Sequence, residues 1–271
     1  DATLATKRGD VHTMTERTFI SQRVKNMGPS GIRRIFDLGA SLKDPIDLSI
    51  GQPDFKVPES VKRAMIRAIE TDRTGYTNTR GIPELRDAIH ARLIEELNWD
   101  VPCFVTSGVS GGLMLACLAC LNPGDEVLLA DPYFVSYPHL VRLAGAVPIM
   151  VSTYDDFQLH PERFAAAITP KTKMILVASP GNPTGVVYRR EDVEALAGLA
   201  RKHDLLIVSD EIYDSLTYDG PSPTPVRFAP ERTLLLRGFG KSHALTGLRI
   251  AYAAGPEPII NEMSKLQQYT F

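Results

Sequence analysis

Short apolar runs of strand length recur along the chain and alternate with segments of helical periodicity. Several runs are continuously apolar rather than alternating, which is typical of strands buried on both faces. Helices placed between such strands favour a parallel sheet. The sequence therefore predicts an α/β fold with a mostly parallel, seven-stranded sheet flanked by helices. The predicted strands are 101–106, 127–130, 147–151, 174–178, 205–209, 233–236 and 249–254.

Three segments carry apolar residues on one helical face, at the spacing of an amphipathic helix. These segments are 61–69, 85–93 and 193–200. A fourth helix, 113–121, is expected after a glycine-rich turn at 107–112. Cys117 and Cys120 lie within this apolar helix, so they are interpreted as core residues and no metal site is predicted.

The composition gives no indication that nucleic acid or a membrane is a partner of this chain. The formal charge of the 271 residues is −2, which gives no broad attraction to nucleic acid or to anionic lipid. The longest apolar run, 113–121, is too short to span a bilayer, so no membrane partner is expected. Three cysteines, an odd number, favour a reducing, cytoplasmic location.

In parallel sheets, ligands bind beyond the carboxyl ends of the strands, so the residues after each apolar run are the candidates for chemistry. Gly108, Val109 and Ser110 follow the first strand and precede a helix, where backbone N–H groups can hold a phosphate. A flexible loop with a serine cap is the alternative interpretation. Asn182 lies between two prolines after the fourth strand, and a surface turn is its alternative.

Two charged residues at later strand ends are harder to explain as surface residues. Asp210 ends an apolar strand, where a carboxylate needs a partner. Its neighbour Glu211 is interpreted as a solvent-facing residue. Lys241 follows Gly240 at the end of another apolar strand, and Arg249 lies eight residues further on.

Two kinds of nucleotide site fit these residues poorly. Gly240, Lys241 and Ser242 resemble the end of a phosphate loop, but the glycine that this motif requires is replaced by Leu235. A nicotinamide site is less consistent still, since no strand is followed by G-x-G-x-x-G.

A pyridoxal phosphate site accounts for the whole set. Such a site needs an amine for the aldehyde, an acid for the ring nitrogen, donors for the ring hydroxyl, a stacking ring and a phosphate cup. The candidates for these roles are, in order, Lys241; Asp210; Asn182 with Tyr213; Tyr133 or Phe134; and residues 108–110 with Arg249.

Together these motifs resemble the class I/II aminotransferases of fold type I, related to aspartate aminotransferase, from about Leu48 to Ala254. The motifs that carry the resemblance are LSIGQPDF, GYTNTRGIPELR, SGVSGGL, DPYFVSY, SPGNPTG, SDEIY and GKSHALTGLR. No single motif is specific, but the ordered set is.

The resemblance implies a role for each matching residue. Lys241 looks like the Schiff-base lysine that also moves the substrate proton, and Asp210 like the partner of the ring nitrogen. The implied cofactor-binding residues are Gly108, Val109, Ser110, Phe134, Asn182, Tyr213 and Arg249, with Tyr76 reaching the site of the partner subunit in a homodimer. Tyr213 is also implied in catalysis, and Gly51 and Asn182 in substrate binding.

The resemblance also implies a domain arrangement. Residues 1–45 are expected to form an N-terminal arm and the first segment of a small domain, and residues 46–271 a large domain that binds pyridoxal phosphate. The second small-domain segment of the family is missing from this sequence. Ser110 replaces a lysine of one dicarboxylate-preferring branch, which weakens the case for that branch's aspartate specificity.

The expected function is amine transfer between an L-amino acid and a 2-oxo acid, with the cofactor alternating between its pyridoxal and pyridoxamine forms. Two alternatives stay open. One is another fold-type-I enzyme, such as a carbon–sulfur lyase or an aminocyclopropane-carboxylate synthase-like protein. The other is a binding module without catalysis on the same scaffold.

Overall fold

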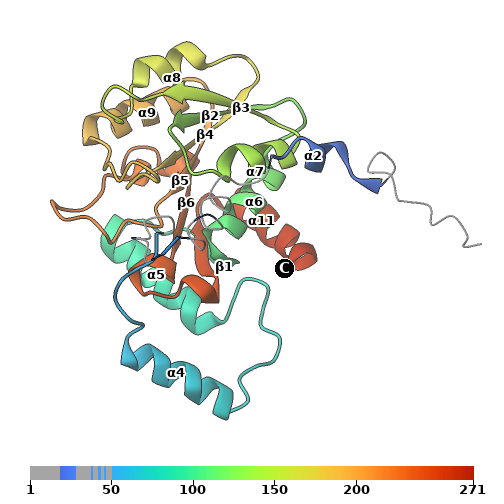
Figure 1. The fold of residues 1–271 in the computed structure, drawn as a ribbon, viewed down its shortest axis with the longest axis vertical. Helices are drawn as coiled ribbons and strands as arrows, with labels where there is room; N and C mark the ends of the chain where they lie inside the picture. Colours follow the sequence, from blue (N-terminus) through green and yellow to red (C-terminus); the bar gives the residue numbers. More distant parts are fainter. Residues whose placement is uncertain (1–18, 29–37, 39–41, 44–45, 47–50) are drawn as a thin grey trace, which may run out of the picture.

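The computed structural model describes residues 19–28, 38, 42–43, 46 and 51–271. A seven-stranded sheet with the order β1-β7-β6-β5-β4-β2-β3 crosses the molecule (Figure 1). Neighbouring strands from β3 to β6 are parallel, whereas β7 is antiparallel to both β6 and β1. The predicted α/β fold and its mostly parallel sheet are confirmed. The strands are β1 (Cys103–Ser107), β2 (Glu126–Asp131), β3 (Val147–Ser152), β4 (Thr172–Ala178), β5 (Leu206–Asp210), β6 (Thr233–Gly238) and β7 (Ile250–Ala254).

Helices connect the strands and cover both faces of the sheet. The α-helices are α2 (Gln22–Lys25), α4 (Glu59–Glu70), α5 (Pro83–Leu97), α6 (Gly108–Cys120), α7 (Tyr137–Leu143), α8 (Pro161–Ala167), α9 (Arg190–Lys202), α10 (Phe239–Ser242) and α11 (Glu257–Thr270). Short 3-10 turns are η1 (Pro225–Arg227), η2 (Pro230–Arg232) and η3 (Thr246–Leu248).

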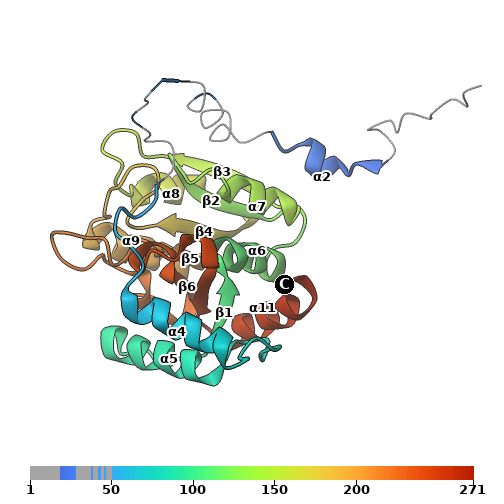
Figure 2. The same cartoon turned by 60° about the horizontal axis from the view of Figure 1, so that its bottom comes forward.

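Alternate residues of each central strand serve two different cores. Met174 and Leu176 of β4 pack with α6, α7 and α11, and α6 and α11 lie side by side (Figure 2). Ile175 and Val177 point to the opposite face, where they pack with α8 and α9. A third cluster joins α5 to β1, β6 and β7. Because both faces are covered, the central residues of these strands are continuously apolar, as their sequences indicated.

The glycine-rich segment after β1 differs from its prediction as a turn. Helix α6 begins at Gly108, so residues 109–112 are already helical. Glycine at position 112 is explained by close packing between helix and sheet and not by a turn. A Cβ at Gly112 would lie 2.9 Å from Leu236 of β6, so glycine at this position lets the helix approach the strand.

Glu211 is a second correction, because it does not face solvent. Its side chain is buried, and its carboxylate accepts hydrogen bonds from Arg237, with Nη2 to Oε2 at 2.9 Å, and from Ser209. The same guanidinium pairs with Glu96 at 2.9 Å and with Asp214 at 3.1 Å. A buried carboxylate requires such a cation, and the sequence offered no way to pair the two residues.

Replacing Arg237 with alanine should therefore lower the free energy of unfolding by about 3–5 kcal/mol, since Glu211 would stay buried without its cation. Urea denaturation measures this loss. Arg201→Ala is the matched control, because Arg201 forms a comparable ion pair with Glu231 at the surface, where it should contribute much less. Equal losses in the two variants would contradict the structural role given to Arg237.

Parts of the predicted organisation are not described. Most of the proposed N-terminal arm, residues 1–45, lies outside the described residues, so the division into domains stays a prediction. Among the described helices, none is long and apolar enough to cross a membrane. Within the same part of the chain, no group of three or more His, Cys, Asp or Glu side chains could hold a metal ion.

Candidate active site

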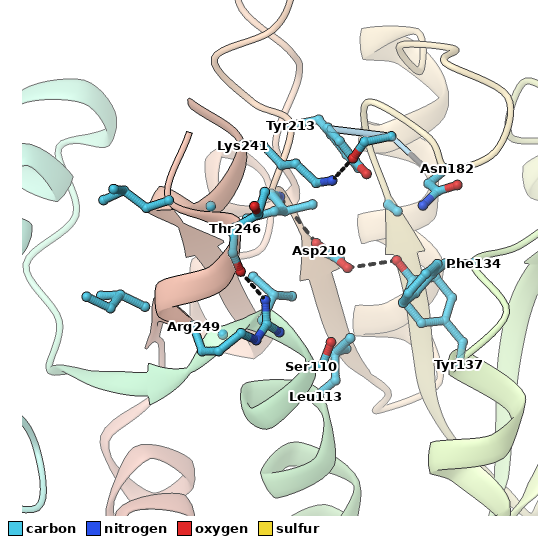
Figure 3. A pocket seen from close by; sticks show the side chains of 18 residues that line it. Ser110, Leu113, Phe134, Tyr137, Asn182, Asp210, Tyr213, Lys241, Thr246 and Arg249 are labelled. Carbon is cyan, nitrogen blue, oxygen red and sulfur yellow. Dashed lines mark hydrogen bonds between the residues drawn. The ribbon is translucent and has the colours of Figure 1, made fainter. Parts of the chain in front are cut away.

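A cavity of about 380 Å³ lies at the carboxyl ends of the central strands, beside the start of α6 (Figure 3). Its size is within the range of small-molecule sites. All the predicted site residues except Tyr76 line it, although they come from segments far apart in the sequence. They are Gly51, Gly108, Val109, Ser110, Phe134, Asn182, Asp210, Tyr213, Lys241 and Arg249.

Asp210 is the last residue of β5 and is buried at the floor of the cavity. One carboxylate oxygen, Oδ2, accepts a hydrogen bond from the hydroxyl of Tyr137 at 2.8 Å, and Oδ1 accepts one from the backbone N–H of Ile212 at 3.2 Å. Burial raises the pKa of Asp210 to about 6, while these two donors oppose the increase. No cation pairs with the carboxylate in the part of the chain that the structure describes.

Lys241 lies on α10, directly after β6, and its side chain points into the same cavity (Figure 3). Its Nζ donates a hydrogen bond to the carbonyl oxygen of Gly51 and lies 5.5 Å from the ring centroid of Tyr213. Partial burial lowers the pKa of the Lys241 amine, and the positive charge of Arg249 lowers it further. Both effects favour the neutral amine, which is the nucleophilic form.

The positive end of the cavity is formed by Arg249 and the start of α6. Arg249 precedes β7 in the left-handed region, with φ of 55°, and its Nη1 donates to the carbonyl of Thr246 at 3.1 Å. The guanidinium lies so close to Gly108 that a Cβ there would be 2.5 Å from Nη2. A cation over the first N–H groups of a 13-residue helix can bind a phosphate.

Asn182 and Tyr213 form the opposite wall of the cavity. Burial raises the pKa of Tyr213, nearby Asp210 raises it further, and a hydrogen bond with Asn182 lowers it. Phe134 lines the cavity, with its ring 5.5 Å from that of Tyr137 in an edge-to-face contact. Tyr133, the alternative stacking residue, does not line this cavity.

Two residues differ from the site that was predicted from the sequence. Tyr76 does not line the cavity and is fully exposed to solvent. Tyr137 was missed, although it is in the DPYFVSY motif and its hydroxyl contacts Asp210. It lies three positions after Phe134, in a turn where the backbone N–H of Tyr137 donates to the carbonyl of Phe134 at 3.0 Å. This turn leads into α7, a helix that was not predicted.

The phosphate-loop alternative is not supported by the local structure. That motif ends in a helix whose N-terminus holds the phosphate. Here Lys241 lies within α10, which ends at Ser242 after four residues. The helix that begins at the cavity is α6, on the far side from Lys241.

Comparisons with known proteins agree with this geometry. The model of the family "Aminotransferase class I and II" matches residues 43–270. A probable aspartate/prephenate aminotransferase of Thermus aquaticus is 44% identical over 90% of this chain and 66% of its own length. A probable aspartate aminotransferase of Methanocaldococcus jannaschii is 41% identical, over 93% of this chain and 69% of its own.

Solved structures give the same result. The aspartate aminotransferase of Thermus thermophilus with maleate superposes with a TM-score of 0.89 at 43% identity, covering 93% of this chain and 68% of that one. The chain thus spans about two thirds of these relatives, and just under that share of the Thermus aquaticus protein. From its fold, its clustered site residues and these similarities, the chain belongs to the class I and II aminotransferase family.

Proposed function

We propose that the protein is a pyridoxal-phosphate-dependent aminotransferase, and that residues 46–271 contribute its cofactor-binding domain. The observation that carries this proposal is the shared cavity of Lys241, Asp210 and Arg249. An amine, a buried carboxylate and a guanidinium thus surround one space of suitable size. The names of the related aminotransferases support the same activity.

The residues present fit this cofactor at three points. The start of α6 with Arg249 would hold the phosphate, since Gly108 leaves room for the guanidinium. Asp210 is buried with no cation from the described residues beside it, and the ring nitrogen in its protonated form would supply one. Asn182 and Tyr213 would donate to the ring hydroxyl, and Phe134 would stack on the ring.

When bound, the cofactor would supply an aldehyde that condenses with an amine and a ring that accepts electrons from the substrate α-carbon. The side chains would control this chemistry. Asp210 would keep the ring nitrogen protonated. Lys241 would attach the cofactor and, once released by the substrate amine, would move a proton at the substrate α-carbon. Its lowered pKa suits both roles.

The substrates would be an L-amino acid and a 2-oxo acid. Aspartate is the first amino donor to test, because several relatives are named aspartate aminotransferases. Gly51 and Asn182 line the same cavity as Lys241, and the side-chain N–H of Asn182 would donate to a substrate carboxylate.

The protein would act as a homodimer in the cytoplasm. Tyr76 is fully exposed next to α4, whose side chains Met65, Ile66 and Ile69 are exposed and apolar. A second subunit would cover such a surface and receive Tyr76 in its own site. The cytoplasmic location rests on the three free cysteines.

Borohydride reduction followed by peptide mapping tests the proposed cofactor. Reduction should fix one pyridoxal phosphate on Lys241, and no adduct on this residue would sink the proposal. In a separate, unreduced sample, adding aspartate alone should convert the bound cofactor to its pyridoxamine form. Release of an elimination product instead would favour a carbon–sulfur lyase or a related enzyme of the same fold.

The phosphate end of the site gives a separate prediction. In Gly108→Ala, the new Cβ would displace Arg249, so the Kd for pyridoxal phosphate should rise roughly tenfold, as for one lost charge-assisted hydrogen bond. Fluorescence titration measures this change. Gly124→Ala is the control. Gly124 also has positive φ, but no atom of the described residues lies within 4 Å of its Cβ position, so this variant shares the backbone strain alone. Equal affinity in both variants would exclude the proposed phosphate cradle.

A further inference from the structure

The hydroxyl of Tyr137 is the side-chain donor to Asp210 in this structure. Tyr137 begins α7 and is 4% exposed, and its hydroxyl lies 2.8 Å from Oδ2 of Asp210 (Figure 3). Its ring is fixed by an edge-to-face contact with the ring of Phe134. Its backbone N–H donates to the carbonyl oxygen of Phe134 at 3.0 Å. The hydroxyl therefore reaches Asp210 from a fixed position.

The direction of this hydrogen bond is set by the surroundings. Burial raises the pKa of Tyr137 well above its usual value, and the charge of Asp210 raises it further. The phenol accordingly keeps its proton over the working pH range and donates a hydrogen bond to the carboxylate. Both carboxylate oxygens are thus engaged before any ligand enters, one by Tyr137 and the other by the N–H of Ile212.

We propose that Tyr137 is a positioning residue, whose hydroxyl orients the Asp210 carboxylate toward the ring nitrogen of the cofactor and stabilises its ionised form. This inference rests on the proposed function, since Asp210 faces a ring nitrogen only when pyridoxal phosphate binds. Tyr137 itself touches neither the substrate nor the reacting atoms; it acts through Asp210.

Other groups around Asp210 do not replace this donor. Glu211 follows it on the same strand end, and its negative charge raises the pKa of Asp210. Tyr213 forms a hydrogen bond with Asn182 instead, and Tyr188 is near enough to Tyr137 to raise its pKa. Lys241 on α10 donates to Gly51, and Arg249 before β7 donates to Thr246. Among the described residues, removing the Tyr137 hydroxyl would leave the Asp210 carboxylate with the Ile212 N–H as its one donor.

The variant Tyr137→Phe tests this role, since it keeps the buried ring and removes the hydroxyl. Two properties should change. In the cofactor-free protein, the carboxyl infrared band assigned by its loss in Asp210→Asn should titrate at higher pH than in wild type. In the loaded protein, the Kd for pyridoxal phosphate at pH 8 should rise about tenfold, as expected for a hydrogen bond to a charged group.

Tyr188→Phe is the matched control, because it also removes a buried hydroxyl but one that does not contact Asp210. Its infrared titration should match wild type. An unchanged Asp210 titration in Tyr137→Phe, or an equal shift in both variants, would overturn the role of Tyr137. The infrared measurement needs no cofactor, so it tests the role of Tyr137 separately from the proposed function. The absence of a borohydride adduct on Lys241 would overturn the proposed function and leave the infrared result unaffected.

Discussion

Replacing Lys241 with alanine should abolish the visible absorbance of the bound cofactor and reduce amine transfer by at least about a thousandfold. Two roles are lost together in this variant. The amine that bonds to the cofactor is missing, and so is the base placed to move the substrate proton. Because Lys241 is half-buried in the cavity, and not part of the core, the fold should be retained.

Absorbance spectra and single-turnover kinetics measure this effect. Lys265→Ala provides the control, since Lys265 is an exposed lysine on α11, paired with Glu262 and remote from the cavity. It should behave as wild type in both assays. Wild-type turnover in Lys241→Ala would refute the assignment of the catalytic amine.

Replacing Asp210 with asparagine should separate function from stability. The neutral amide cannot keep the ring nitrogen protonated, so turnover should fall at least about a hundredfold, the equivalent of one strong charge-assisted interaction. The cofactor-free protein should become more stable at pH 8, because the buried negative charge is removed. Loss of activity would then accompany a gain in stability.

The direction of this stability change follows from the pKa of Asp210, which burial raises to about 6 in the folded state from an ordinary value of 3.8. Between these values the folded state binds more protons than the unfolded state. The contribution of Asp210 to the unfolding free energy of wild type therefore falls as pH rises from about 4 through about 6, by roughly 3 kcal/mol. Asp210→Asn should lose this dependence.

Chemical denaturation of the cofactor-free protein at several pH values measures both effects. The control is Asp219→Asn, which removes an exposed carboxylate from a loop and should leave the pH dependence of wild type in place. A wild-type pH profile in Asp210→Asn would show that another group is responsible.

The strands were predictable because most contain a continuous apolar run, and the central ones are followed by polar residues. Asp210 and Asn182 could be found in this way, since a strand end in a parallel sheet has a known place relative to a ligand. Arg249 could not, because it lies before β7, which runs antiparallel, and reaches the cavity from the opposite strand end. Its motif, and not its topology, indicated its role.

Contacts between segments far apart in the chain could not be predicted from the sequence. Arg237 is buried against Glu211 and Glu96, but each of these residues looks like an ordinary surface charge in isolation. Tyr137 needed the unpredicted helix α7 to reach Asp210. Gly112 appeared to belong to a loop, yet it lets α6 pack against Leu236. In each case the missing information was which elements pack together.

A crystal structure with pyridoxal phosphate would test the central claim most directly. We expect one cofactor in the 380 Å³ cavity, with its ring nitrogen in hydrogen-bond contact with Asp210, its aldehyde carbon bonded to Lys241, and its phosphate between Arg249 and the start of α6. A cofactor bound elsewhere, or bound here without contact to Asp210, would contradict the account.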